Sequence, residues 1–334
     1  MSVGKSVEKP DQEPVISLEK ICASPDLLRD FLAGINYVAD GNDAGGKSSA
    51  TKAVKEWLVN HGLQVYNLIE FQRKTNRTWP DSRDFPVQSV AEKSKIVWID
   101  MLSNSYDALI LGEPAWAGGG WDLRMGTLQH LDAFSPRELV EGFSAYRSPL
   151  YGLVIVPWLE EGGPQGKGGI ILKERDLSTS IIYQPIFYQI DKEDGHEVEC
   201  VDINFVISRE GNKRALAAPP SALFIMTCSA EEAVRRITHQ RLDKKDNCAF
   251  ETPKYLPRVV EAYRSDQLDT FFTPRGTYVA HIDTTGWQVQ DTMNAVTHQW
   301  ELFLKARWTA KYGAPVPCSA EKLVEEATPL ACGD

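Results

Sequence analysis

The segment from Gly41 to Ser48 constrains this chain more than any other part of its sequence. It reads Gly41-Asn42-Asp43-Ala44-Gly45-Gly46-Lys47-Ser48, which matches a glycine, four residues, and then Gly-Lys-Ser/Thr. Residues 35–40, directly before it, are largely apolar and predict a short buried strand. After it, apolar residues from Ala50 to Leu58 recur at the spacing of one helical face, and Gly62 ends that helix. A strand, a glycine-rich loop and a helix in this order predict a phosphate-binding loop.

The residue types in this loop suit the binding of a nucleoside triphosphate. Glycines allow several backbone N–H groups to surround phosphate oxygens, and the start of the following helix adds the positive end of its dipole. We expect Lys47 to bridge the terminal phosphates of ATP and the Ser48 hydroxyl to bind Mg²⁺. Further nucleotide contacts are expected from Gly41, Asn42, Ala44, Gly45, Gly46 and Ser49. The alternative is a glycine-rich turn that precedes a helix and binds no phosphate.

Composition limits the classes of ligand and the cellular location. The 334 residues carry a net charge of −10 and the sequence pI is about 5.2, which argues against a general nucleic-acid-binding surface. The six cysteines show no CxxC spacing, so neither a zinc site nor a disulfide scaffold is expected. No apolar run is long enough to span a bilayer, and the N-terminus lacks a signal-peptide core. These features predict a soluble cytoplasmic protein that does not associate with membranes.

Predicted strands and helices alternate along the chain. Besides residues 35–40, strands are predicted at 64–69, 106–111, 170–172, 223–226 and 278–282, and helices at 17–33, 50–61, 135–161, 230–241, 253–264 and 286–312. Pro149 is expected to kink the helix at 135–161. The alternation predicts an α/β fold in which a P-loop NTPase-type parallel β-sheet is flanked by helices on both faces.

One domain is expected over residues 16–315, between polar tails at 1–15 and 316–334. Two insertions are expected within it, near 71–105 and 191–218. The alternating pattern at 196–210, inside the second insertion, predicts an added β-hairpin.

Charged residues directly follow several of the predicted strands. Glu113 follows the strand at 106–111, Glu174 and Arg175 follow the strand at 170–172, and Asp283 follows the last strand. In open parallel sheets ligands bind at the carboxyl ends of the strands, where the phosphate loop also lies. These residues are therefore candidates for a site shared with the loop.

Three further segments, in this order, resemble those of thymidylate kinases, within the P-loop nucleoside and nucleotide kinases. The first is Phe143-Ser144-Ala145-Tyr146-Arg147, which is similar to a Phe-x-Ala-x-Arg segment of that family. The second runs from Glu174 to Gln184 and resembles the family's Asp-Arg-Tyr…Ser-Ser…Tyr-Gln segment. The third resembles its lid helix, and runs from Ala230 to Arg241 before Phe250-Glu251 and Arg258…Tyr263. The resemblance covers about residues 36–304.

The resemblance implies ATP-dependent phosphoryl transfer to a nucleoside monophosphate with a thymidylate-like or modified pyrimidine base. In that case Phe143 would stack on the acceptor base, Arg147 would contact the acceptor nucleotide, and Arg175 would bridge the donor and acceptor phosphates. Further acceptor contacts would come from Glu113, Tyr146, Ser180, Tyr183 and Gln184. Asp43, Glu174, Arg236 and Arg241 would have catalytic or metal-binding roles. Asp283 and Thr284 would contact the adenine of ATP. A helical lid and a homodimer are also implied.

Two departures from the family pattern keep a second reading open. The family usually has Arg-Glu-Pro where this chain has Gly112-Glu113-Pro114, and Glu174 stands where it has Asp. These residues resemble deoxynucleoside kinases, in which a glutamate in the place of Glu113 takes the proton of a 5′-hydroxyl. A polyphosphate-using kinase is a more distant alternative, since its loop also reads Asp-Ala-x-Gly-Lys. A nucleotide-binding regulatory protein without an acceptor site is the non-catalytic alternative.

Several of these residues also have a plain structural interpretation. Asp43 is a common turn residue, and Arg175 and Glu174 fit a surface ion pair or a strand end. Phe143 and Tyr183 fit core packing. The arginines of the predicted lid fit a solvated helix face, and Asp283 with Thr284 fits a helix cap.

Overall fold

Six parallel strands form the centre of the protein. The structure is a computed structural model that describes residues 16–67, 106–111, 135–162, 166–240 and 253–313. The strands are β1 Asn36–Gly41, β2 Val65–Asn67, β3 Ala108–Leu111, β4 Ile170–Glu174, β5 Ala222–Thr227 and β6 Tyr278–Asp283, and they lie in the order β2-β3-β4-β1-β5-β6. Every neighbouring pair is parallel. The predicted parallel α/β sheet is therefore confirmed.

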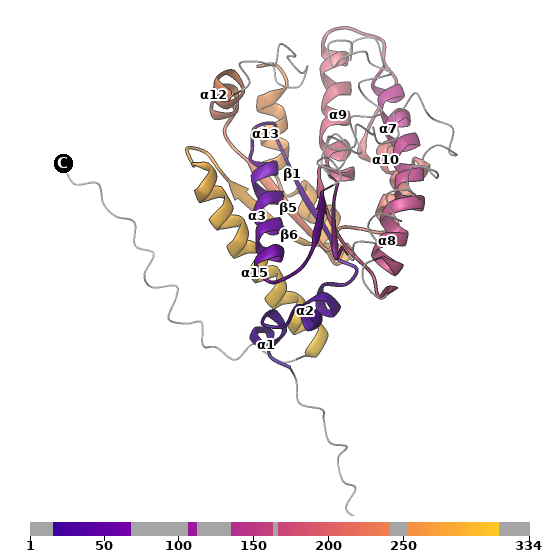
Figure 1. The fold of residues 1–334 in the computed structure, drawn as a ribbon. Coiled ribbons are helices and arrows are strands. Elements are labelled where there is room, and N and C mark those ends of the chain that lie inside the picture. The colour runs from indigo at the N-terminus through magenta and orange to yellow at the C-terminus, as the bar shows by residue number, and fades with distance from the viewer. Residues whose placement is uncertain (1–15, 68–105, 112–134, 163–165, 241–252, 314–334) are drawn as a thin grey trace, which may run out of the picture.

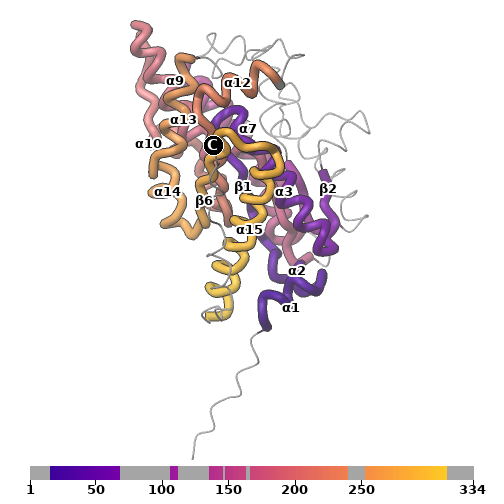
Figure 2. Tube along the Cα trace, turned by 90° about the vertical axis from the view of Figure 1, so that its left-hand side faces the viewer, coloured from indigo at the N-terminus to yellow at the C-terminus, as the bar shows by residue number. Residues whose placement is uncertain are grey.

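Helices cover both faces of this sheet (Figure 1). One face packs on α1 Leu18–Cys22, α2 Pro25–Leu32, α3 Lys47–Asn60 and α15 Val289–Tyr312. The other packs on α7 Pro136–Leu150, the π-helical turn η4 Tyr151–Ile155, α8 Val156–Glu161, α9 Leu177–Glu193, α13 Leu256–Arg264 and α14 Gln267–Phe272. Successive residues of the central strand serve the two cores: Tyr37 and Ala39 lie in the first and Val38 in the second. Helices α1 and α2 lie at the end of the molecule away from α12 Ala230–Gln240 (Figure 2).

Two of the predicted helices are interrupted for identifiable reasons. The segment predicted as one helix at 17–33 is two, because Ser24 caps α2 with its hydroxyl and Pro25 occupies the first turn. The helix predicted at 135–161 begins with the expected capping box of Ser135 and Glu138 and widens into η4 just after Pro149. Proline has no N–H to donate, so Pro149 removes one hydrogen bond from the helix, and the hydrogen-bonding pattern changes to a π turn from Tyr151.

The predicted β-hairpin at 196–210 is wrong. The described chain there contains α10 Ile203–Ile207 and the start of α11 Glu210–Ala217. The Asp202 side chain accepts the Phe205 N–H at 2.7 Å and so caps α10, which the alternating pattern does not reveal. Helix α11 packs closely on α7, since a Cβ at Gly211 would lie 1.9 Å from the Ser144 carbonyl oxygen. Close packing of helix on helix has replaced the strand pairing that alternation favours.

Some predictions fall outside the described residues. These are the tails at 1–15 and 316–334, the insertion near 71–105, Glu113, Arg241 and most of the segment after α12, while the side chain of Tyr146 on α7 is also not described. The assignment of residues 16–315 to one domain stays a prediction. Among the helices that are described, none has both the length and the apolar character needed to cross a membrane.

Candidate functional site

The phosphate loop connects the central strand β1 to α3 and lies against the end of β5. A Cβ at Gly41 would sit 1.8 Å from the Met226 carbonyl oxygen, and one at Gly45 would sit 2.4 Å from the same atom. Gly41, Ala44 and Gly46 have φ of 141°, 59° and 103°, so the loop adopts a positive φ at three positions. The glycines are thus required by the close approach of the loop to β5 as well as by its turns.

The loop presents unused backbone donors at the start of α3. Within the part of the chain that the structure describes, the N–H groups of Ala44, Gly46, Lys47 and Ser48 donate to no protein acceptor. The Lys47 ammonium folds over the loop and donates to the carbonyls of Gly41 at 3.3 Å and Asn42 at 2.9 Å. Converging N–H groups, a helix start and a lysine form a surface suited to phosphate oxygens.

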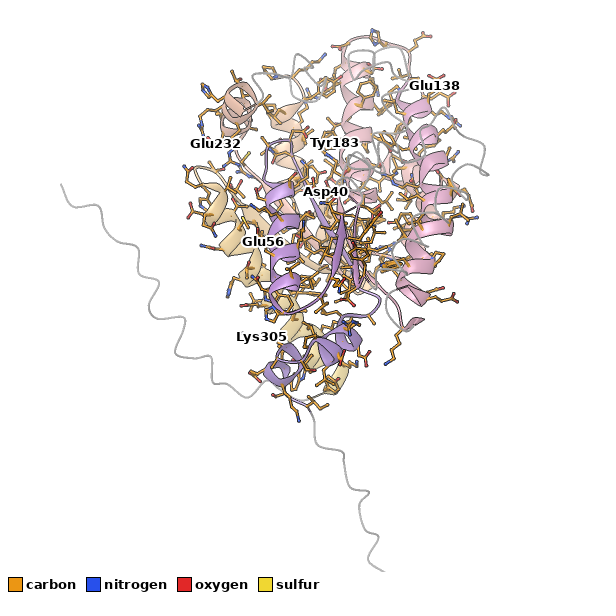
Figure 3. All side chains as sticks on the ribbon, in the orientation of Figure 1. Asp40, Glu56, Glu138, Tyr183, Glu232 and Lys305 are labelled. Carbon is orange, nitrogen blue, oxygen red and sulfur yellow. The ribbon has the colours of Figure 1, made fainter. Side chains whose placement is uncertain are left out.

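The strand end before the loop is held by a buried carboxylate. Asp40 is fully buried and accepts hydrogen bonds from the Gly41 N–H, the Ser178 and Thr179 hydroxyls, and the Tyr263 hydroxyl at 2.9 Å. Burial and the Asp40 charge together raise the pKa of Tyr263 well above its usual value, so Tyr263 stays a donor. Figure 3 marks Asp40 and Tyr183, which both contact Tyr263.

Ser48 and Glu174 bring a hydroxyl and a carboxylate together beside the loop. The Ser48 hydroxyl donates to Glu174 Oε2 at 2.8 Å, across 126 residues of sequence. Oxygen ligands of these two kinds suit Mg²⁺, which keeps several waters and binds substrate phosphates as well. The described residues contain no cluster of three or more His, Cys, Asp or Glu side chains that would bind a metal alone. The donor set therefore fits a magnesium ion carried by a nucleotide.

Arg175, directly after β4, contacts Asp43 of the loop. Its guanidinium donates to the Asp43 carboxylate, and the Lys47 ammonium lies 3.7 Å from the same oxygen. The Tyr183 hydroxyl donates to the other Asp43 oxygen at 3.4 Å, and Arg175 lies over the Tyr183 ring. Arg175 has a φ of 65°, which is rare for a residue with a side chain. The loop, β4 and α9 thus meet at one buried group of charges.

Arg236 on α12 is fully committed to protein acceptors. Its five N–H groups donate to Glu232, the Ala44 carbonyl, the Thr284 hydroxyl, the Thr284 carbonyl and the Trp287 carbonyl, at 2.5–3.3 Å. These hydrogen bonds join α12, the phosphate loop and the segment after β6. The Thr284 hydroxyl in turn donates to the Gly45 carbonyl at 3.1 Å. Arg236 would have to break these hydrogen bonds to reach a phosphate, so the geometry favours a positioning role over a catalytic one.

Two carboxylates beside this junction, Glu232 and Asp283, have pKa values below the ordinary ones. Hydrogen bonds from Arg235 and Arg236 lower the pKa of Glu232 to about 2. Burial opposes ionisation of Asp283, but hydrogen bonds from Thr285 and an ion pair with Arg264 outweigh it and lower its pKa. Asp283 therefore stays a carboxylate that caps the segment after β6.

Arg147 on α7 donates hydrogen bonds to other parts of the protein. Arg147 is only 1% exposed and donates to Asn212 Oδ1 at 2.8 Å, the Ser180 hydroxyl at 2.7 Å and the Asp176 carbonyl at 3.1 Å. Phe143 is half-buried and its ring centroid lies 5.8 Å from the Arg147 guanidinium carbon. In this structure Arg147 joins α7, α9 and α11.

Gln184 on α9, unlike Arg147, is a buried polar side chain whose amide has no hydrogen-bond partner among the described residues. It is 5% exposed, and neither its amide oxygen nor its amide nitrogen has a hydrogen-bond partner within the described chain. Buried polar groups are nearly always paired, because an unpaired one carries the full desolvation cost of about 1–3 kcal/mol. A ligand that supplies a donor and an acceptor would satisfy this amide.

Solved structures that are similar to this chain include a thymidylate kinase from Candida albicans. The match has a TM-score of 0.42 and 14% sequence identity, and it covers 82% of this chain and 93% of that one. No protein-family model matches the sequence, and no curated protein matches it.

The structure brings most of the predicted site residues together and adds others. Gly41–Ser48, Glu174, Arg175 and Tyr183 meet at the loop, while Ser180 and Arg147 lie in the buried region behind it. The residues that the sequence did not reveal are Asp40, Tyr263 and Cys228, whose backbone N–H donates to the Asn42 amide oxygen at 3.0 Å. Asp40 had one available signal, since a carboxylate at the end of an apolar strand is costly unless it is paired.

Proposed function

We propose that this protein is an ATP- and Mg²⁺-dependent kinase that transfers a phosphoryl group to a nucleoside monophosphate with a thymidylate-like or modified pyrimidine base. The observation that carries the proposal is the loop at Gly41–Ser48, whose N–H groups at the start of α3 have no acceptor among the described residues, together with its buried Lys47 and the Ser48–Glu174 pair beside it. A cytoplasmic location and a homodimer remain predictions from the sequence.

Phosphoryl transfer requires little covalent chemistry from the protein, but it requires aligned phosphates and compensated charge. We assign the donor phosphates to the loop N–H groups and Lys47, and the metal to Ser48 and Glu174. A bound Mg²⁺ would neutralise charge that develops on the phosphates. Arg175 is close enough to Lys47, through Asp43, to serve a second phosphate on the acceptor side. If Arg175 released Asp43, its guanidinium N–H groups could donate to that acceptor phosphate.

The acceptor base is assigned to the side of the loop formed by α7 and α9. Tyr183 lies against Asp43, and Gln184 has both amide groups unpaired within the described residues. A primary amide donates and accepts along one edge, which matches the adjacent carbonyl and N–H of a pyrimidine. Phe143 on α7 supplies the aromatic face for stacking under this assignment. Tyr146, Glu113 and Arg241 keep their proposed acceptor and lid roles.

A nucleoside acceptor is the second candidate. It is favoured by the inward hydrogen bonds of Arg147, which direct that cation toward Asn212, Ser180 and the Asp176 carbonyl rather than toward an acceptor phosphate. In this case Glu113 would take the proton of the 5′-hydroxyl, and Glu113→Gln would abolish nucleoside phosphorylation.

A coupled ADP-release assay separates the candidates. The purified protein is given Mg·ATP with a panel of nucleoside monophosphates, nucleosides or no acceptor, and a parallel series replaces ATP with polyphosphate. We expect ADP release that depends on a pyrimidine monophosphate and is lost in Lys47→Ala. Release with nucleosides alone supports the second candidate. ATP binding without turnover on any acceptor, or ADP release that needs no acceptor, would reject the kinase assignment.

A further inference from the structure

A buried ion pair closes the turn that follows β4. The Lys173 ammonium donates to the Asp176 carboxylate, three residues on, and the two residues are 1% and 5% exposed. We call this pair the β4 clip. Of the two residues between its ends, Glu174 accepts from Ser48 and Arg175 donates to Asp43. The clip thus brackets the last residue of β4, Glu174, and the first residue after it, Arg175, which both contact the phosphate loop.

Residues of α7 and η4 hold the Asp176 end of the clip. The Tyr151 hydroxyl donates to Asp176 Oδ2 at 2.5 Å and accepts from the Lys173 ammonium at 2.8 Å. Arg147 donates to the Asp176 backbone carbonyl at 3.1 Å. Tyr151 is the first residue of the π-helical turn after Pro149, a form of helix that often occurs at functional sites.

The two cations next to Asp176 favour its ionised form. Burial opposes ionisation of Asp176, but Lys173 and Arg147 outweigh it and lower its pKa, so Asp176 is a carboxylate at neutral pH. Burial lowers the pKa of Lys173, and Asp176 opposes that shift. A buried ion pair contributes little net stability compared with apolar side chains of the same volume. Conformational specificity is the better physical reason for a Lys–Asp pair at this position.

The backbone between the ends of the clip needs such a constraint. Arg175 has a φ of 65°, in the left-handed region, which is unfavourable for a residue with a side chain. Such conformations persist only where the surroundings hold them. The Arg175 N–H donates to the Ala39 carbonyl at 2.9 Å, and this hydrogen bond fixes the Arg175 backbone to β1. The clip fixes the same turn on its other side, toward α7 and η4.

We propose that Lys173 and Asp176 are positioning residues for the phosphoryl transfer proposed above, on which this inference rests. The clip fixes the backbone of Glu174 and Arg175 so that one side chain meets Ser48 and the other meets Asp43. Neither Lys173 nor Asp176 touches a phosphate in this scheme.

A double-mutant cycle tests the clip without any assay of activity. Unfolding free energies are measured for Asp43→Asn, Arg175→Gln and the double variant, first in the wild-type protein and then in Lys173→Met. We expect the Asp43–Arg175 coupling to fall by about half or more in Lys173→Met and to be largely retained in Lys173→Arg. The matched control is Trp158→Phe, which removes another buried hydrogen bond to β4, from Trp158 Nε1 to the Ile170 carbonyl at 3.0 Å. That control should leave the coupling unchanged.

Unchanged coupling in a folded Lys173→Met protein would overturn the proposal. If Lys173→Met does not fold, Tyr151→Phe is used in its place, because this variant keeps both charges and removes one of the hydrogen bonds to Asp176. A partial loss of the Asp43–Arg175 coupling in Tyr151→Phe supports the proposal, and no loss overturns the proposal. In the kinetic arm, Lys173→Met should lower kcat about 10-fold or more with KM for ATP within about 2-fold. An equal rise in KM would indicate disruption of the loop and contradict positioning. A wild-type protein inactive on every acceptor would reject the proposed function, while the cycle would still decide on the clip.

Discussion

The Arg175 guanidinium donates to the Asp43 carboxylate across 132 residues of sequence, and both side chains are nearly buried. Asp43 is also 3.7 Å from the Lys47 ammonium, so one carboxylate faces two cations in this structure. Bound phosphates would compete with Asp43 for both of them. The pair therefore links the donor side of the loop to the strand that carries Glu174.

Replacement of Gly45 by alanine should destabilise the protein through lack of space. The added Cβ would lie 2.4 Å from the Met226 carbonyl oxygen, which belongs to a central strand and has little freedom to move. We expect Gly45→Ala to lower the free energy of unfolding by about 2–4 kcal/mol. Denaturant titration measures the change.

Gly276→Ala is the matched comparison for Gly45→Ala. Gly276 has a φ of 82° but open space around it, so alanine there meets only the conformational cost of about 1 kcal/mol. Equal losses at the two positions would show that contact with β5 is not what requires Gly45.

Loss of either member of the Ser48–Glu174 pair should weaken the use of magnesium. We expect Ser48→Ala and Glu174→Gln each to raise the Mg²⁺ concentration for half-maximal ADP release about 10-fold or more. Each variant removes one of the two protein oxygen ligands that we assign to the metal. Thr51→Val removes another hydroxyl from the same helix, one that has no hydrogen-bond partner in the described chain, and should leave the magnesium dependence as it is. A magnesium dependence equal to wild type in both pair variants would remove these residues from the metal site.

Arg236 and Arg235 provide a neighbouring pair that separates positioning from surface charge. Both donate to Glu232, but only Arg236 also reaches Ala44, Thr284 and Trp287. Arg236→Ala should therefore raise the Kd for ATP about 10-fold or more and lower thermal stability, since buried acceptors lose their donor. Arg235→Ala should change either quantity little. Calorimetric titration with ATP and thermal unfolding measure the two effects, and similar results for both variants would contradict the positioning role.

The stabilisation that Glu232 contributes should depend on pH in a defined direction. Its folded pKa is about 2, below the ordinary value of 4.5, so its contribution is present above about pH 5 and is lost as the pH falls toward 2. We expect Glu232→Gln to lower the melting temperature at pH 7 and to differ little from wild type near pH 2. Thermal melts of both proteins between pH 2 and pH 7 give this difference. A difference that does not shrink with acid would show that charge is not its source.

Local pattern was sufficient for the parts of the fold that depend on local physics. The loop from Gly41 to Ser48, between β1 and α3, was predictable because its glycines and the apolar segments on either side are signals within a few residues. The strands around Val38, Ile171 and Phe224 were predictable because buried parallel strands are continuous apolar runs. Helix α9 was harder, since it is buried on most of its faces and so lacks the usual periodicity.

Only the tertiary structure decided the partners of the charged side chains. The sequence indicated by itself that a strand, a glycine-rich loop and a helix belong to a parallel α/β fold, because these signals are local. It did not reveal that Arg147 donates to Asn212, that Arg236 donates to backbone carbonyls, or that Lys173 and Asp176 form an ion pair inside the core. Hydrogen bonds between residues far apart in sequence depend on how helices cross the sheet, and that geometry leaves no periodic trace in the chain.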